Sequence, residues 1–252
     1  MADLANRVAL VTGSSRGIGA AIAELFARHG AAVAVHGRDA AAVATTTSAI
    51  EAAGGRAIGV TCELTRFDDI EAARHRIEDT LGPVDIVVAN AGGNPARPAP
   101  LETLDEDAFR RSIDVNLTAT FLTIKSFLPG MKQRGRGSII TMSSAASRRP
   151  TAHSPLPYAA AKAGIEVLTR GLATQAGPSG VRVNCIAPET ILTERNLAMI
   201  PADTQEQMRV THPIQRLGIP MDVASAALFF ASDDAAWITG VVLDVAGGSV
   251  LA

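Results

Sequence analysis

Several residue types are scarce in this 252-residue chain, and each scarcity excludes a class of protein. Aromatic residues make up only 4% of the chain and include a single tyrosine, so the base-stacking surfaces of single-strand nucleic-acid binders are not expected. The formal net charge is −2, which gives no basic excess for nucleic acid or an anionic membrane. Apolar runs stay short of the ~18 residues that a membrane span needs. We therefore expect neither nucleic acid nor membrane as a partner.

Cysteine is also scarce, because Cys62 and Cys185 are the only two and form no C-x-x-C pair. Isolated cysteines predict neither a disulfide framework nor a zinc site, and both are interpreted as small core residues. The first seven residues lack the charged and then apolar layout of a secretion signal. A reducing, cytoplasmic setting with no bound metal is therefore the expectation.

Hydrophobic residues make up 47% of the chain, as is typical of a protein with a large buried core. Short β-branched runs alternate with alanine-rich helical patterns, which predicts a doubly wound, parallel α/β sheet with helices on both faces. No linker or repeat interrupts this alternation, so we expect one domain over residues 1–252. The predicted strands span residues 8–12, 32–36, 57–61, 84–89, 138–142, 182–187 and 241–245. The predicted helices span residues 17–28, 40–53, 67–81, 105–134, 158–176 and 222–231.

The strongest local signal is the glycine-rich turn that follows the first predicted strand. Gly13, Gly17 and Gly19 have the spacing G-x-x-x-G-x-G and lead directly into a helical pattern. Glycine permits positive φ and close approach of a ligand, and the free N–H groups at a helix start favour phosphate. The turn therefore predicts a dinucleotide phosphate site, although the same glycines also occur in ordinary strand-to-helix turns.

The end of the second predicted strand, His36-Gly37-Arg38-Asp39, bears on the choice of dinucleotide. An acid here binds the ribose 2′-OH of NAD, whereas an arginine suits the 2′-phosphate of NADP. Arg38 offers donors matched to phosphate, Arg16 can lie on the same side, and Asp39 is better placed as a helix N-cap. We therefore favour NADP(H) over NAD(H), with a solvated surface charge as the alternative for Arg38.

Polar residues also follow the next two predicted strands. Glu63 and Leu64 come after the third, and Asn90-Ala91-Gly92 comes after the fourth. Ligands of open α/β sheets bind at this edge, although asparagine and glycine also mark ordinary turns. Asn116 lies inside a long predicted helix, where a buried amide needs partners and can equally be a satisfied core residue.

The single tyrosine, Tyr158, stands four residues before Lys162. Residues at this spacing project side by side from a helix. A neighbouring cation favours the phenolate, so we expect Lys162 to lower the pKa of Tyr158 towards neutrality. A phenol tuned in this way can transfer a proton at working pH. The same pair can also flank a solvated helix face.

Together these motifs resemble the short-chain dehydrogenases/reductases. The shared pattern is Thr12-Gly13-x-x-x-Gly17-x-Gly19, Asn90-Ala91-Gly92, Asn116, Ser144 and Tyr158-x-x-x-Lys162, and the resemblance extends from residue 7 to about residue 248. Within the family the chain looks most like the 3-oxoacyl-[acyl-carrier-protein] reductase group. The resemblance implies a Rossmann-type seven-stranded sheet, a nicotinamide cofactor and a small carbonyl or alcohol substrate. It also implies a homotetramer packed through the helices predicted at 105–134 and 158–176.

The resemblance further implies a role for each site residue. Tyr158 is the general acid/base, Lys162 holds the nicotinamide ribose and Ser144 binds the substrate oxygen. Asn116 holds a water that connects Lys162 to solvent. The residues implied to contact the cofactor are Gly13, Ser15, Arg16, Gly17, Ile18, Gly19, Arg38, Glu63, Leu64, Asn90, Ala91, Gly92, Tyr158, Lys162, Pro188, Ile191 and Thr193.

Several positions depart from the family pattern. Glu63 stands where an aspartate is usual, and Glu189 follows Pro188 where a glycine is usual, which places a charge near the nicotinamide or the substrate. The spacing from Ser144 to Tyr158 is one residue longer than expected, so Ser143 and Ser147 are alternatives to Ser144. Residues 177–180, Gly-Pro-Ser-Gly, lack the basic residue typical of acyl-carrier reductases, which leaves docking of an acyl-carrier protein open.

Two further segments concern the substrate. Residues 192–216 have a mixed helical pattern and, by resemblance, form a lid over the substrate. Arg148 and Arg149 are candidates to attract an anionic substrate, or else are surface charges. We expect an NADP-dependent oxidoreductase, with a 3-oxoacyl thioester as a candidate substrate. The alternatives are an NAD(P)-dependent sugar or secondary-alcohol dehydrogenase and a catalytically silent NADP-binding regulator.

Overall fold

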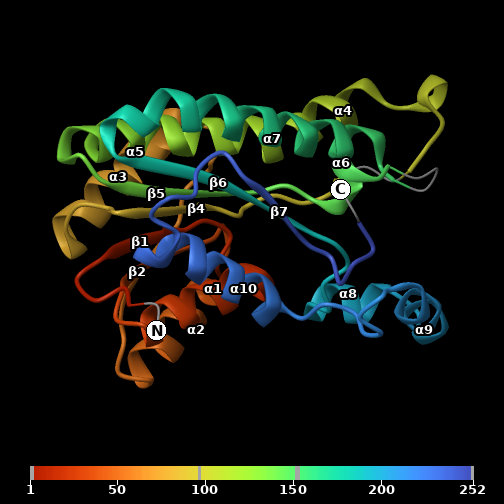
Figure 1. Cartoon of the computed structure of the whole chain (residues 1–252), viewed down its shortest axis with the longest axis horizontal. Coiled ribbons are helices and arrows are strands. Elements are labelled where there is room, and N and C mark those ends of the chain that lie inside the picture. Colours follow the sequence, from red (N-terminus) through yellow and green to blue (C-terminus); the bar gives the residue numbers. More distant parts are fainter. Residues whose placement is uncertain (1–2, 96–97, 151–153, 251–252) are drawn as a thin grey trace.

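A computed structural model describes residues 3–95, 98–150 and 154–250 of the chain. Seven parallel strands form one sheet in the order β3-β2-β1-β4-β5-β6-β7 (Figure 1). This confirms the predicted doubly wound sheet, and each strand lies within two residues of its predicted bounds. The strands are β1 (Val8–Val11), β2 (Ala32–His36), β3 (Arg56–Val60), β4 (Ile86–Ala89), β5 (Gly137–Met142), β6 (Val181–Pro188) and β7 (Val242–Val245).

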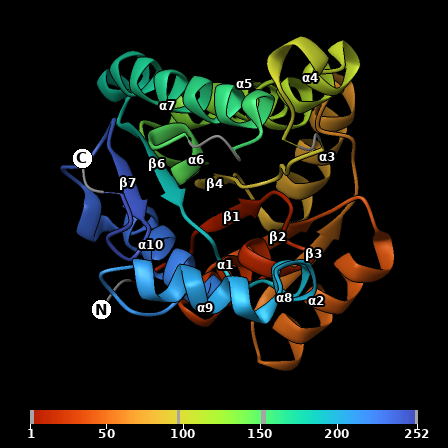
Figure 2. The same cartoon turned by 90° about the vertical axis from the view of Figure 1, so that its right-hand side faces the viewer.

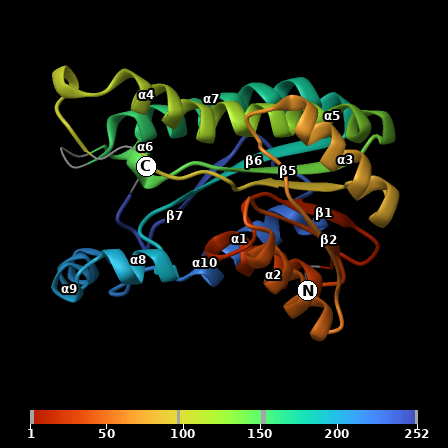
Figure 3. The same cartoon turned by 180° about the vertical axis from the view of Figure 1, so that it is seen from behind.

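Helices cover both faces of the sheet, with α1, α2 and α10 on one face and α3, α4, α5 and α7 on the other (Figures 1 and 3). The α-helices are α1 (Gly17–Arg28), α2 (Ala40–Ala52), α3 (Phe67–Leu81), α4 (Glu106–Ile113), α5 (Ala119–Arg134), α6 (Ala145–Arg148), α7 (Leu156–Ala176), α8 (Glu194–Met199), α9 (Ala202–Thr211) and α10 (Pro220–Ala231). Short 3-10 helices span Leu101–Thr103, Gly177–Ser179 and Asp233–Ala235. None of the helices in the described ranges is long and apolar enough to cross a membrane.

The strands are apolar on both sides because each side packs against a helical layer. In β4, Ile86 and Val88 join the core formed with α1 and α10, whereas Val87 faces the core formed with α3 and α5. Phe26 of α1 and Phe127 of α5 are large buried residues of these two cores. Burial on both sides leaves only the strand ends free to contact a ligand.

The predicted helix at 105–134 is interrupted, because a π-helical segment, Asp114–Thr118, joins α4 to α5. The widened turn contains Asn116, which is fully buried. Such π-segments occur frequently at functional sites. The neighbouring helix α7 begins two residues before its predicted start, with Pro157 in its first turn, where a missing N–H is tolerated.

The carboxyl ends of all seven strands lie along one edge, which Figure 2 views face-on. The glycine turn after β1, the loop after β4 and helix α6 after β5 all begin there. Helices α8 and α9 occupy the segment predicted as a lid and lie beyond the same edge (Figures 1 and 2). The sheet topology therefore gathers residues from distant parts of the sequence at a single place.

Candidate active site

The glycine turn between β1 and α1 has the geometry of a phosphate cradle. Gly13 and Gly17 have φ of 65° and 59°, a region that favours glycine. A Cβ on Gly19 would lie 2.3 Å from the carbonyl oxygen of Gly13, so no side chain fits there. Helix α1 receives no side-chain cap and has no acidic residue in its first turn. These features fit a bound dinucleotide phosphate.

His36 holds this turn against the neighbouring strand, a role that the sequence did not reveal. Its Nδ1 accepts from the backbone N–H of Gly13 at 3.1 Å, and its Nε2 lies 3.2 Å from the carbonyl oxygen of Cys62. Because a carbonyl can only accept, Nε2 carries the proton and the ring is neutral. Burial lowers the pKa of His36 below its ordinary value of 6.5, which also favours the neutral ring.

The end of β4 is fastened to the same turn. The amide of Asn90 donates to the carbonyl oxygens of Thr12 and Gly13 at 2.9 and 3.2 Å, and the Ala91 N–H donates to the Thr12 hydroxyl at 2.9 Å. The predicted cofactor residues Asn90 and Ala91 therefore lie beside the predicted phosphate turn. Asn90 acts here as a brace between two strand ends.

Asn116 fixes the loop that follows Gly92. Its amide nitrogen donates to the carbonyl oxygens of Gly93 and Ser112, each at 2.8 Å, and its side-chain oxygen accepts from the Gly93 N–H at 3.1 Å. A Cβ on Gly92 would lie 2.6 Å from that side-chain oxygen. Both amide hydrogens of Asn116 are thus used by the protein. The role of Asn116 in holding a water stays a prediction.

The candidate catalytic residues meet where β5 ends and α7 begins. Ser144 is the N-cap of α6, and its hydroxyl forms a hydrogen bond with Tyr158. The ammonium of Lys162 donates to the carbonyl oxygen of Met142 at 2.9 Å and lies 5.5 Å from the centre of the Tyr158 ring. Of the three serines considered from the sequence, Ser144 is the one bonded to Tyr158. The other two, Ser143 and Ser147, bind Glu166 instead.

The expected lowering of the Tyr158 pKa is wrong for this structure. Burial raises the pKa of Tyr158, and the hydrogen bond from Ser144 offsets this only in part. The Lys162 ammonium lies over the ring and points to Met142, and it is itself almost fully buried. Burial lowers the pKa of Lys162 to about 8, so the side chain stays mostly charged at neutral pH.

The residues after β2 match the prediction for Asp39. Its Oδ1 accepts from the N–H groups of Ala41 and Ala42 at 3.0 and 3.2 Å, which makes Asp39 the N-cap of α2. Its Oδ2 lies 3.4 Å from Arg16, and both side chains are exposed. Arg38 is exposed next to this pair. Two arginines therefore lie at the place predicted for the 2′-phosphate.

The remaining predicted cofactor residues line the same edge. The Glu63 carboxylate accepts from the N–H and the hydroxyl of Thr65, and the Leu64 side chain is buried in the core, so Leu64 can offer only its backbone. Thr193 caps α8, and a Cβ on Gly17 would lie 3.2 Å from its methyl carbon. Thr193, near the start of the predicted lid, therefore lies against the glycine turn. Ser15 lies within that turn and Ile18 in the first turn of α1, Pro188 ends β6, and Ile191 is buried beside Gly218.

Among the described residues, the Glu189 carboxylate contacts Thr190 and His212 and not the candidate catalytic residues. It accepts from Thr190 and lies 2.9 Å from Nε2 of His212, which follows α9. The other ring nitrogen of His212 lies 2.6 Å from the Met208 carbonyl oxygen. Glu189 and His212 line a cavity of about 400 Å³ between the end of β6, residues 212–218 and β7. The pair fastens the end of the predicted lid to the sheet.

The idea that Arg148 attracts a substrate is contradicted by its contacts. Arg148 lies between Glu166 and Asp244, at 3.4 and 3.3 Å, and Arg149 donates to the carbonyl oxygen of Ser249. A different cation lies beside the loop after β4. Nη1 of Arg195, on α8, would lie 3.7 Å from a Cβ on Gly93, and within the described ranges its guanidinium has no hydrogen bond or ion pair.

Proteins similar to this chain include named dehydrogenases. Residues 13–249 match the family described as enoyl-(acyl carrier protein) reductase. The chain is 42% identical over 244 residues to cis-4-hydroxycyclohexanecarboxylate dehydrogenase of Sinomonas cyclohexanicum, with 97% of this chain and 96% of that protein covered.

Two solved structures of oxidoreductases are similar to this chain over almost its whole length. A 7α-hydroxysteroid dehydrogenase complexed with NADH and 7-oxo glycochenodeoxycholic acid has a TM-score of 0.93 at 36% identity, covering 98% of this chain and 96% of that one. A 3-oxoacyl-[acyl-carrier protein] reductase from Brucella melitensis has a TM-score of 0.93 at 37% identity, covering 99% and 93%. The similarity therefore includes both the sheet and the edge that carries the site.

The neutral state of His36 predicts a pH dependence of stability. The unfolded chain binds a proton near pH 6.5, whereas the folded chain binds it only at lower pH. The contribution of His36 to the free energy of unfolding is therefore fully present above pH 6.5 and is lost as the pH falls through the folded-state pKa. This loss amounts to at most about 1.4 kcal/mol per pH unit. We expect urea unfolding of the His36→Asn variant to show a weaker loss of stability on acidification than the wild type. Parallel curves for the two proteins would contradict this role of His36.

Proposed function

Because the chain belongs to the short-chain dehydrogenase/reductase family, and is thus an oxidoreductase, we propose that it is an NADP-dependent enzyme acting on a carbonyl or alcohol. The observation that carries this proposal is the contact of Tyr158 with the Ser144 hydroxyl and the Lys162 ammonium. This trio lies at the sheet edge that also holds the phosphate cradle. A catalytically silent regulator would not need all three groups.

A bound nicotinamide would donate hydride to a carbonyl carbon, or accept it from an alcohol. As hydride arrives, negative charge develops on the substrate oxygen, and Ser144 and Tyr158 are placed to donate hydrogen bonds to it. Tyr158 then gives its proton to that oxygen, so a ketone, hydride and proton yield a secondary alcohol. The raised pKa of Tyr158 keeps this proton in place until it is needed. Lys162, still charged at neutral pH, stabilises the phenolate that remains.

Removing the phenol tests this proposal. We expect Tyr158→Phe to reduce kcat by about 10²–10⁴-fold, because the proton donor is lost while the ring still packs. Turnover is followed by NADPH absorbance with a panel of ketones that includes a 3-oxoacyl thioester. NADPH binding, measured by fluorescence, serves as the control and stays near the wild-type value. A wild-type protein that binds NADPH but reduces none of the panel would indicate the silent regulator.

The proposed preference for NADP rests on charge at the end of β2. Arg38 is exposed, and Asp39 is engaged as a helix cap and by Arg16, so no free carboxylate there opposes a 2′-phosphate. A phosphate gains charge-assisted hydrogen bonds from arginine. The similar 7α-hydroxysteroid dehydrogenase was solved with NADH, so the preference needs a direct test.

Replacing Arg38 by alanine tests the cofactor preference. We expect the KM for NADPH to rise about tenfold or more, since a charge-assisted hydrogen bond contributes roughly 1.5–3 kcal/mol. The KM for NADH should change little. Arg28→Ala, which removes an exposed arginine at the far end of α1, is the matched control. A clear preference of the wild type for NADH would contradict the proposal.

The substrate is proposed to be an acid, with a 3-oxoacyl thioester as the second candidate. Arg195 supplies a cation without a partner among the described residues, beside the loop after β4. The relatives named above include a cis-4-hydroxycyclohexanecarboxylate dehydrogenase and a structure holding 7-oxo glycochenodeoxycholic acid. A carboxylate remote from the reacting carbonyl would form an ion pair with Arg195. The likeness to 3-oxoacyl reductases supports the second candidate.

Matched ketones test the acid proposal. With 4-oxocyclohexanecarboxylate we expect Arg195→Ala to raise KM about tenfold, whereas KM for neutral cyclohexanone stays the same. Arg195→Lys, which keeps the charge, should retain most of the affinity. An equal rise of KM for both ketones, together with weaker NADPH binding, would instead assign Arg195 to the cofactor phosphates.

Assembly and lid movement are proposed on a different basis. Phe121 of α5 and Val167 of α7 are 46% and 63% exposed, on helices that lie side by side in Figures 1 and 3. Exposed apolar side chains on one layer suit an interface between copies, which supports a homotetramer packed through these helices.

Residues 192–216 are proposed to act as the substrate lid. Both cysteines are free, in keeping with the proposed cytoplasmic setting.

A further inference from the structure

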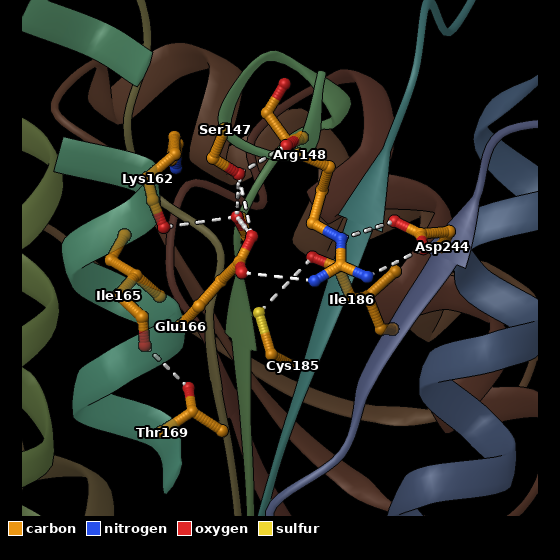
Figure 4. Close-up of polar contacts among 11 residues, drawn as sticks. Ser147, Arg148, Lys162, Ile165, Glu166, Thr169, Cys185, Ile186 and Asp244 are labelled. Atoms are coloured by element: carbon orange, nitrogen blue, oxygen red, sulfur yellow. Dashed lines mark hydrogen bonds and ion pairs between the residues drawn. The ribbon is translucent and has the colours of Figure 1, made fainter. Parts of the chain in front are cut away.

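Glu166 lies on the face of α7 that carries the candidate catalytic residues. It follows Tyr158 and Lys162 at intervals of four residues, so the three side chains line one side of the helix. Only 8% of the Glu166 side chain is exposed, although carboxylates are seldom buried without partners. Figure 4 shows its carboxylate pointing into the space between α7 and the strands.

The partners of this carboxylate come from the segment around Ser144. One oxygen of Glu166 accepts from the hydroxyls of Ser143 and Ser147, at 2.8 and 2.7 Å. The other oxygen lies 3.4 Å from the guanidinium of Arg148. Ser147 and Arg148 therefore converge on Glu166 (Figure 4), together with Ser143.

These contacts complete a residue-by-residue connection between the end of β5 and α7. The Met142 carbonyl oxygen accepts a hydrogen bond from the Lys162 ammonium. The next residue, Ser143, binds Glu166 through its hydroxyl, which also lies 3.1 Å from the Lys162 carbonyl oxygen. The third residue, Ser144, binds Tyr158 through its hydroxyl. The Ser147 hydroxyl also lies 2.6 Å from the Ser144 carbonyl oxygen. Loss of the hydrogen bonds from Ser143 and Ser147 to Glu166 would free Ser144 to shift relative to Tyr158.

Arg148 extends the connection to the edge of the sheet. Its guanidinium lies 3.3 Å from Asp244 on β7, with only 22% of the Arg148 side chain and 17% of the Asp244 side chain exposed. A half-buried arginine held between two carboxylates is more rigid than a surface ion pair. Helix α6, whose N-cap is Ser144, is thus held on two sides by the contacts of Arg148 (Figure 4).

We propose that Glu166 is a positioning residue that, through Ser143, Ser147 and Arg148, holds the Ser144 hydroxyl at the distance from Tyr158 that proton transfer requires. The Glu166 carboxylate is engaged by Ser143, Ser147 and Arg148, so we infer that it acts through these side chains. Its effect is therefore on the chemical step rather than on binding. The inference rests on the proposed function, in which Ser144 and Tyr158 share the substrate oxygen.

The test compares Glu166→Ala with Glu166→Gln. We expect Glu166→Ala to lower kcat about 10–100-fold, with KM and the NADPH dissociation constant within about twofold of wild type, because a small misplacement affects the reaction more than binding. Glutamine keeps an acceptor for both serine hydroxyls, so Glu166→Gln should recover kcat to within about fivefold of wild type. Unchanged kcat in the alanine variant, or a loss confined to KM, would overturn the proposal.

Glu71→Ala is the matched control, because Glu71 on α3 also binds a serine, Ser126, and an arginine, Arg74, outside the site. It should lower Tm and leave kcat unchanged. A loss of kcat in Glu166→Ala no greater than in Glu71→Ala would show a merely structural role and overturn the proposal.

A second readout does not depend on turnover. Tyr158 is the only tyrosine, so ¹³C-tyrosine labelling gives one ring environment to follow by NMR. We expect its signals to shift in Glu166→Ala, to return towards the wild-type position in Glu166→Gln, and to stay in place in Glu71→Ala. Unshifted signals in Glu166→Ala would overturn the positioning role even if no ketone substrate were found. A wild type without turnover would contradict the proposed function alone.

Discussion

The burial of one ammonium group, that of Lys162, governs the arrangement of the candidate site. A buried charge needs a fixed acceptor, and here that acceptor is the carbonyl oxygen of Met142 at the end of β5. This bond connects the end of β5 to α7, the helix that also carries Tyr158. The cation is only partly stabilised by its surroundings, as its lowered pKa shows. A site built in this way keeps a positive charge close to a phenol and away from water.

The other half of the edge depends on neutral groups. The glycine turn is held by an uncharged imidazole from His36 and by the amide of Asn90, each bonded to backbone atoms. Neutral braces leave the positive end of the α1 dipole undisturbed for an anion. The two halves of the edge therefore differ in charge. The glycine turn is suited to the negative charge of a bound ligand, whereas the part around Tyr158 holds the positive charge of Lys162. Asn116 and Gly92 lie between the two halves and leave no space for an added side chain.

Much of the fold and part of the candidate site can be predicted from the sequence, because they depend on patterns among residues that are close together in the chain. The alternation of strands and helices predicts the sheet, and the four-residue spacing of Tyr158 and Lys162 predicts their shared helix face. What the sequence does not show is which distant side chains meet. Arg148 and Asp244 are separated by nearly a hundred residues, and His36 gains its role only because β2 pairs with β1. The direction of the Tyr158 pKa shift likewise depends on burial, which spacing alone does not reveal.

The anchor on β7 has a consequence for the order in which the molecule is built. A ribosome makes the chain from its amino end, and folding can begin before synthesis is complete. Strands β1 to β6 and the helix with Tyr158 all emerge before Asp244. A nascent chain can therefore bury its cores while Arg148 still lacks its outer partner. The ion pair that fastens the segment bearing Ser144 to the edge of the sheet is therefore completed only when the last strand pairs with β6.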